Sequence, residues 1–344
     1  MLQETIARYK RRQAAAQLAC RYTKAVALVG LGQHALANII PVLEQLRTPL
    51  RYICVRSLGT ATLAARRFPQ ARIVATLDPI LADPAVAALF VTSSPTSHFP
   101  LAASILQSGK ALFIEKPPCQ TLDQLHQLVR LRHTHGDLPV QVGLQRVHAP
   151  AVQLLRRHLV RHHPDHYLLR YCTGAYPEGD PLLDLYIHPL HLATHLFGPG
   201  MVRSLIRTHN GTILISLDHN GVVGTLELST AYSWQQTVDQ LTVATSGGTY
   251  HLQGTFELTF MPQSGTLGGI PLEKIRPRHP SLRTLYRHDT FSPTLANNSL
   301  AVSGFLGEIT AFLDTIEHRP HTSLTTLESL VPLYRTIDYI NRQP

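Results

Sequence analysis

The sequence predicts an α/β protein in which a doubly wound parallel sheet precedes an α+β domain with an open, mostly antiparallel sheet. Two observations predict this fold. Up to about residue 145, short and almost wholly apolar segments alternate with helix-length segments, as in a parallel sheet covered on both faces. Later segments alternate polar with apolar residues and follow one another through short turns, as antiparallel strands do.

The elements of the first half support the parallel sheet. Each apolar segment ends before a stretch with helical spacing, so that strands and helices alternate regularly. The predicted strands are 24–29, 50–57, 71–76, 87–94, 111–114 and 139–146, and the predicted helices are 33–43, 62–68, 99–110 and 121–136.

The second half has a different rhythm. Asn-Gly and Gly-Gly pairs separate its alternating segments, which is typical of hairpin turns. A sheet of this kind has an open face, and because such faces seldom remain bare we expect a homodimer or homotetramer. The predicted helices are 149–163, 181–198 and 326–343, the strands are 166–174, 202–209, 211–219, 221–232, 240–248 and 248–260, and 263–300 is predicted to be a loop.

Length and composition limit the possible classes of protein. The 344 residues suffice for a helical extension over 1–23, a first domain over 24–145 and a second over 146–344. No apolar run is long enough to span a membrane, and the first twenty residues lack the apolar core of a secretory signal, so we expect a cytoplasmic protein without a membrane partner. Four widely spaced cysteines are predicted to be packing residues rather than disulfide or zinc ligands: Cys20, Cys54, Cys119 and Cys172.

The formal net charge of +9 raises the question of nucleic-acid binding. The basic residues are scattered, however, with short clusters only at 10–12 and 154–163 and no recognition motif beside them. We therefore predict no nucleic-acid partner, and attribute the charge to solvated faces or to attraction for small anions.

A glycine motif follows the first predicted strand. Gly30 and Gly32 are followed by Ala35, with Gln33 and His34 between them, directly before a helix. In this pattern the first glycine permits a tight turn, the second lets the backbone approach a pyrophosphate, and the third small residue allows close packing of the helix. The motif predicts a dinucleotide at the helix N-terminus.

The end of the second strand bears on which dinucleotide is bound. An acidic residue at this point binds the ribose 2′-hydroxyl and would repel a 2′-phosphate. The position here is Val55, followed by Arg56 and Ser57, and these two can donate hydrogen bonds to a phosphate. The sequence therefore favours NADP(H), with acceptance of NAD(H) as well as the alternative.

Two charged residues end the fifth strand. Glu115 and Lys116 follow four apolar residues and precede Pro117 and Pro118. Ligands of doubly wound sheets bind at the carboxyl ends of the strands, so both side chains are expected to line the cofactor crevice. The structural alternative is a surface ion pair that caps the strand.

With these motifs the chain resembles the Gfo/Idh/MocA oxidoreductases, a family that includes glucose-fructose oxidoreductases and inositol dehydrogenases. The resemblance extends over nearly the whole chain from Lys24, and it implies a Rossmann domain followed by an α+β substrate and oligomerisation domain. The segments that carry it, in the order of the family, are "VGLG", "VTSSPTSH", "EKPP", "QVGLQRVHAPAV", "DLYIHPLHLATHLFG", "GVVGTLELST" and "TTLESLVPLYRTID".

The resemblance implies roles for several residues. Lys116 matches the lysine of the family's EKP motif and would polarise the substrate oxygen. Asp184 and His188 match its D-x-x-x-H motif, and an i, i+4 spacing predicts one helix face for both. His188 would be the general acid or base, and Asp184 would bind a substrate hydroxyl or orient the site. Four further positions match residues that line the cofactor crevice or open the second domain: Ser93, Ser94, His98 and Arg146.

Two departures from the family pattern affect the predicted substrate pocket. Tyr186 stands where the family commonly has Gly, and His191 where it has Asp; with Arg146 they are predicted to contact substrate. The spacing of His191 and His195 also allows a metal site, but the Glu of the HExxH signature is missing. We therefore predict no metal.

These residues together predict an NAD(P)-dependent oxidoreductase that transfers a hydride between nicotinamide and a carbinol or carbonyl carbon of a sugar, polyol or related small metabolite. Two alternatives remain open. One is a non-catalytic NADP-binding sensor or scaffold, against which the set Lys116, Asp184 and His188 argues. The other is elimination or hydrolysis of a glycoside through transient oxidation by a tightly bound cofactor.

Overall fold

A computed structural model describes residues 2–18, 21–275, 281–289, 291, 294–320 and 323–343. The fold divides into two compact units. The first comprises residues 1–114, 131–140 and 309–323, and the second comprises residues 115–130, 141–308 and 324–344. Of the predicted packing cysteines, Cys54, Cys119 and Cys172 are buried, and Cys20 lies outside the described residues.

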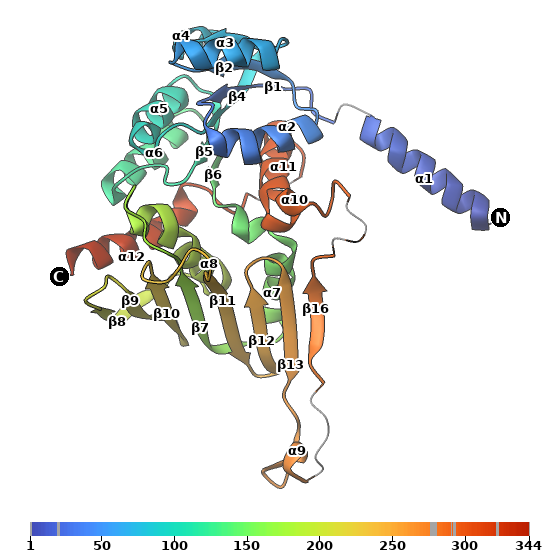
Figure 1. Cartoon of the computed structure of the whole chain (residues 1–344), viewed down its shortest axis with the longest axis vertical. Coiled ribbons are helices and arrows are strands. Elements are labelled where there is room, and N and C mark those ends of the chain that lie inside the picture. Colours follow the sequence, from blue (N-terminus) through green and yellow to red (C-terminus); the bar gives the residue numbers. More distant parts are fainter. Residues whose placement is uncertain are drawn as a thin grey trace. The chain divides into compact units, whose positions relative to one another are not determined.

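The first sheet is parallel, as predicted, with strand order β3-β2-β1-β4-β5-β6. Its central strands are buried on both faces, which explains their nearly continuous apolar sequences. Helices lie on both sides of it in Figure 1. The strands are β1 (Ala25–Val29), β2 (Leu50–Cys54), β3 (Arg72–Val74), β4 (Val86–Val91), β5 (Ala111–Glu115) and β6 (Val140–Gly143).

The helix α11 (Phe305–Ile316) has no counterpart among the predicted elements, although it completes the core of the first unit. Its Phe312 packs edge-on against Phe90 and Phe113, with ring centroids 5.4 and 5.8 Å apart. The other helices in this part of the chain are α1 (Leu2–Leu18), α2 (Ile40–Gln45), α3 (Leu58–Arg67), α4 (Asp78–Leu81), α5 (Pro95–Gln107) and α6 (Leu122–Thr134), and a π-helical turn η1 (Ala35–Ile39) precedes α2.

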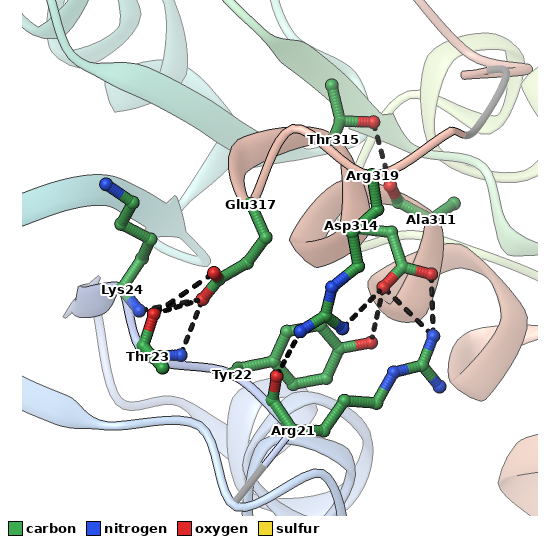
Figure 2. Close-up of polar contacts among 9 residues, drawn as sticks. All are labelled: Arg21, Tyr22, Thr23, Lys24, Ala311, Asp314, Thr315, Glu317 and Arg319. Atoms are coloured by element: carbon green, nitrogen blue, oxygen red, sulfur yellow. Dashed lines mark hydrogen bonds and ion pairs between the residues drawn. The ribbon is translucent and has the colours of Figure 1, made fainter.

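A polar cluster ties the segment before β1 to α11 (Figure 2). Asp314 accepts hydrogen bonds from Arg21 at 2.8 Å, from the hydroxyl of Tyr22 at 3.1 Å and from Arg319 at 3.3 Å. Both guanidinium groups also lie over the Tyr22 ring, 5.2 and 5.1 Å from its centroid. The Lys24 amide donates to Glu317 at 2.8 Å. The Asp314 carboxylate thus accepts hydrogen bonds from three side chains and fixes the position of the chain before β1.

Replacing Asp314 is expected to destabilise the first unit. In Asp314→Ala the buried Tyr22 hydroxyl loses its acceptor and two guanidinium groups lose their carboxylate, so we expect a loss of about 2 kcal/mol in the free energy of unfolding, measured by urea denaturation. The control Asp338→Ala removes an exposed pair with Arg342 and should cost less than about 0.5 kcal/mol. Equal losses in the two variants would contradict the structural role of Asp314.

The second sheet has strand order β16-β13-β12-β11-β7-β10-β9-β8 and is antiparallel except between β7 and β10. Alternate residues of β9 are buried, which leaves the other face of the sheet open as predicted. Its strands are β7 (Pro164–Cys172), β8 (Met201–Arg207), β9 (Ile213–His219), β10 (Val222–Ser229), β11 (Val238–Thr245), β12 (Gly248–Gln253), β13 (Glu257–Pro262) and β16 (Arg283–Arg287).

Two predictions for this sheet were wrong. The segment 248–260 forms two strands rather than one, because Gly254 adopts a positive φ of 53° and turns the chain. The predicted loop 263–300 contains β16, which pairs with β13, together with a small hairpin of β14 (Thr266–Leu267) and β15 (Ile270–Pro271), and the helices α9 (Leu272–Ile275) and the start of α10 (Ser299–Ser303).

Helices cover the inner face of the second sheet. The helix α7 (Pro150–Leu159) contacts β12, β13 and β16, and α12 (Val331–Arg342) contacts β8 and α8 (Ile187–Phe197). Shorter turns precede them: η2 (Gln145–His148), the π-helical η3 (Leu182–Tyr186) and η4 (Glu328–Leu330). Among all the helices described, none combines the length and apolar character required to cross a bilayer.

Candidate functional site

A pocket of about 550 Å³ opens at the carboxyl ends of β1, β2 and β4. We call it the glycine-loop pocket. It brings together six of the residues that the sequence predicted to bind a cofactor: Gly30, Gly32, Arg56, Ser57, Ser93 and Ser94. The location is the one that the topology of a doubly wound sheet predicts for a ligand.

Glycine stands at positions 30 and 32 for different structural reasons. Gly30 adopts a φ of 92°, and a Cβ built there would lie 2.8 Å from the backbone nitrogen of Ser93. Gly30 is also fixed in place, because its amide donates to Cys54 at 3.0 Å and its carbonyl accepts from the Thr92 hydroxyl at 2.9 Å. A Cβ at Gly32 would meet nothing within 4 Å. The loop therefore leaves open space at Gly32, as close approach of a pyrophosphate requires.

The pocket edge at Arg56 and Ser57 suits an anion. Ser57 caps α3, since its hydroxyl oxygen accepts from the Thr60 amide at 3.4 Å, and the hydroxyl proton stays available to a ligand. The exposed Arg56 lies beside it. The pocket-lining residues, all of them in the described part of the chain, include no Asp or Glu.

Six other predicted cofactor residues do not line this pocket. Two of them are Glu115 and Lys116 at the end of β5, which were expected to line the cofactor crevice. Gln33 and His34 are exposed beyond the loop, where His34 lies 3.1 Å from the Asn38 side chain, and Ala35 is buried at the start of η1. His98 is also buried, with Nε2 2.8 Å from the carbonyl oxygen of Ser93. His98 therefore lies behind Ser93 and supports the pocket wall. Its predicted place in the cofactor crevice is corrected accordingly.

In the second unit, Lys116 is directed toward the segment that carries Asp184 and His188. Its ammonium donates to the backbone carbonyl of Asp184 at 2.7 Å. Burial lowers the pKa of Lys116, and the charges of Glu115 and Asp184 oppose that shift. A partly desolvated ammonium interacts more strongly with a developing oxyanion than an exposed one does.

Asp184 and His188 lie in two consecutive helical segments. Asp184 lies in the π-helical turn η3 and His188 in α8, and a π turn shifts the positions of side chains relative to a regular helix. The carboxylate of Asp184 accepts from the hydroxyl of Tyr176 at 3.4 Å. His188 lines a second pocket, whose lining does not include Asp184. The shared face of the two side chains stays a prediction.

This second pocket, the His188 pocket, has a volume of about 210 Å³. It joins the predicted His188 and Arg146 to two residues that the sequence analysis missed, Asp239 and Tyr171. Arg146 forms an ion pair with Asp239 and lies over the Tyr171 ring, 5.6 Å from its centroid. Tyr171 and Asp239 are directly paired across β7 and β11. The register of β11 on β7 brings both residues to Arg146. Because this register depends on pairing between distant strands, the local sequence does not predict it.

Tyr186 and His191, predicted to contact substrate, are buried and do not line the His188 pocket. Burial, reinforced by His195 and His148, lowers the pKa of His191 to about 3, so this residue is a neutral core histidine. Within the described residues no group of three or more His, Cys, Asp or Glu side chains is arranged to hold a metal ion.

The buried His191 should make stability depend on pH. Its pKa is lower in the folded protein than the ordinary value of 6.5, so the unfolded chain binds the additional proton. The stability contribution is therefore complete above about pH 6.5 and is lost toward pH 3, by about 1.4 kcal/mol per pH unit. We expect His191→Leu to reduce this slope in urea unfolding, and the exposed control His209→Leu to preserve it. An unchanged slope in His191→Leu would contradict this assignment.

The chain is similar to known proteins in both sequence and fold. Residues 24–144 match the Gfo/Idh/MocA model, described as an oxidoreductase family with an NAD-binding Rossmann fold. The chain is 28% identical over 144 residues to the inositol 2-dehydrogenase of Acidothermus cellulolyticus. That alignment covers 40% of this chain and 42% of the relative, so the matched segment spans about two fifths of the relative's length.

Two solved structures show the same fold at low identity. A dehydrogenase from Chromobacterium violaceum has a TM-score of 0.76 and 21% identity, over 93% of this chain and 95% of its own. A 3-ketoreductase from Actinomadura kijaniata, crystallised with NADP and TDP-benzene, has a TM-score of 0.71 and 17% identity, over 92% and 96%.

The parallel sheet, the glycine loop and the open pocket beside it agree with the NAD-binding Rossmann fold that this family model describes. Over residues 24–144 the chain thus matches the model of the Gfo/Idh/MocA oxidoreductase family, the family that the sequence was found to resemble.

Proposed function

We propose that the protein is an NADP(H)-preferring dehydrogenase or reductase that acts on a carbinol or carbonyl carbon of a neutral sugar or polyol. The observation that carries the proposal is the glycine-loop pocket, with open space at Gly32, Arg56 and Ser57 at its edge and no carboxylate in its lining. The names of the relatives, an inositol dehydrogenase and a ketoreductase, support a hydroxylated substrate.

The glycine loop and Ser93 would hold the pyrophosphate half of the dinucleotide, and Arg56 and Ser57 its 2′-phosphate. When bound, the nicotinamide supplies the hydride donor or acceptor of the reaction. The chain supplies the proton chemistry and the charge stabilisation. Lys116 stabilises negative charge that develops on the reacting oxygen, and His188 exchanges the proton of that oxygen.

The His188 pocket favours a neutral substrate. Among the described residues that line this pocket, Arg146 carries the guanidinium group and already forms an ion pair with Asp239. A substrate carboxylate would be repelled by the charge of Asp239, whereas hydroxyl groups can bind to the paired side chains without breaking that pair. The exposed ring of Phe256 at the pocket edge offers an apolar surface to the CH face of a sugar ring. Neutral polyols should therefore be better substrates than sugar acids.

Arg56 tests the proposed cofactor preference. In Arg56→Ala we expect the NADPH affinity to fall by about tenfold while NADH affinity stays unchanged, because only NADPH carries the phosphate that the guanidinium binds. Affinities are measured by fluorescence titration at fixed salt. The control Arg66→Ala removes the same charge from an exposed position of α3 outside the pocket and should leave both affinities unchanged. Equal losses for NADPH and NADH in Arg56→Ala would refute the assignment.

A further inference from the structure

A second buried carboxyl group lies close to the Glu115–Lys116 turn. Glu308, on α11, has no exposed surface, and Glu115 is 7% exposed. Both approach the same dipeptide, Gly143 and Leu144. The Oε1 atom of Glu308 accepts from the Leu144 amide at 2.7 Å, and a Cβ on Gly143 would lie 2.8 Å from both carboxylate oxygens of Glu115. Glycine at 143 is thus required for Glu115 to occupy its place.

Two adjacent buried carboxylates would be costly, because each charge is desolvated and each repels the other. Lys116 is the ammonium next to Glu115 in the chain and interacts with it. On the other side lie the uncharged amide of Gln141 and the imidazole of His148, which is 3.2 Å from that amide. One proton shared by the carboxyl pair removes the repulsion.

We propose that Glu308 is an uncharged carboxylic acid that positions Glu115 beside Lys116, so that the two carboxyl groups together carry one negative charge. The role of Glu308 as a positioning residue rests on the proposed function of Lys116. Burial and the charge of Glu115 raise the pKa of Glu308 well above its ordinary value, although hydrogen bonds from Leu144 and Gln141 oppose the shift. Because Oε1 accepts from the Leu144 amide, Oε2 is the oxygen that we assign the proton.

Infrared difference spectroscopy of the full chain tests the protonation state without substrate. The wild type near neutral pH should show the carbonyl stretch of a protonated carboxylic acid, and this band should be missing in Glu308→Gln. In Glu115→Gln the band should disappear at a lower pH than in the wild type, because the neighbouring charge is removed. Lack of the protonated band in the wild type, or the same band in Glu308→Gln, would overturn the proposal.

Turnover tests the positioning role separately. Glu308→Gln, which keeps shape and neutrality, should retain the wild-type kcat, whereas Glu308→Ala should lower kcat by up to about a hundredfold through misplacement of Lys116, with dinucleotide affinity unchanged. Equal losses in Glu308→Gln and Glu308→Ala would contradict positioning by a neutral acid. If the wild type turns over no substrate but the infrared band is present, the proposed function fails and the protonation of Glu308 stands.

Discussion

Lys116→Met should lower turnover by about 10²–10³ while leaving NADPH affinity nearly unchanged. In the proposed function the ammonium stabilises charge on the substrate oxygen, and methionine preserves the length of the side chain without its charge. The measurement is steady-state kcat together with a fluorescence titration of NADPH. Because Lys116 is buried and donates to Asp184, a thermal unfolding scan is needed to show that the variant is folded.

Lys110→Met is the matched control for this experiment. Lys110 is also a buried lysine, and it donates to the carbonyl oxygens of Asp83 and Val86 at 2.8 Å. Its loss should lower stability but not the turnover of the folded enzyme. Wild-type turnover in Lys116→Met, or an equal loss in Lys110→Met, would show that Lys116 has no chemical role.

The two loop glycines should respond differently to alanine. Gly30→Ala forces a side chain into a positive-φ conformation and against the backbone of Ser93, so we expect loss of dinucleotide binding together with about 1–3 kcal/mol of stability. Gly32→Ala meets no protein atom and should leave stability unchanged. It should still lower dinucleotide affinity by at least about tenfold, because the methyl group occupies the space left for the pyrophosphate.

Urea denaturation and NADPH titration of both variants separate these effects. Gly136→Ala provides a control for strain alone, since Gly136 has a positive φ of 76° with no atom within 4 Å of its Cβ and lies outside the glycine-loop pocket. It should lower stability slightly without changing affinity. Wild-type affinity in Gly32→Ala would mean that the dinucleotide does not approach this loop.

The sequence predicted the glycine loop well because its physical requirements select particular residues. A turn with positive φ and close approach selects glycine, as at Gly30. The strand ends of a parallel sheet lie together at one edge, so Arg56 and Ser93 line the same pocket. The order of strands and helices was predictable for the same reason, since buried parallel strands leave nearly continuous apolar segments.

Other features depend on non-local geometry. The helix α11 follows the second sheet in sequence, yet it completes the core of the first unit through Phe312. A prediction that assumes each domain to be one continuous segment therefore assigns this helix to the wrong core. Asp239 reaches Arg146 through the register of β11 on β7. The π-helical turn that holds Asp184 leaves no residue-specific signal in the sequence.

The most direct test of the central claim is the absorbance of reduced nicotinamide when the wild-type protein is mixed with NADP⁺ or NAD⁺ and a panel of neutral polyols and sugars, with the matching sugar acids as comparison. The account predicts substrate-dependent formation of reduced nucleotide, faster with NADP⁺ than with NAD⁺, and on neutral substrates rather than acids. Binding of NADPH without reduction or oxidation of the nucleotide by any member of the panel, assayed in both directions, would contradict it and would favour a non-catalytic dinucleotide-binding protein.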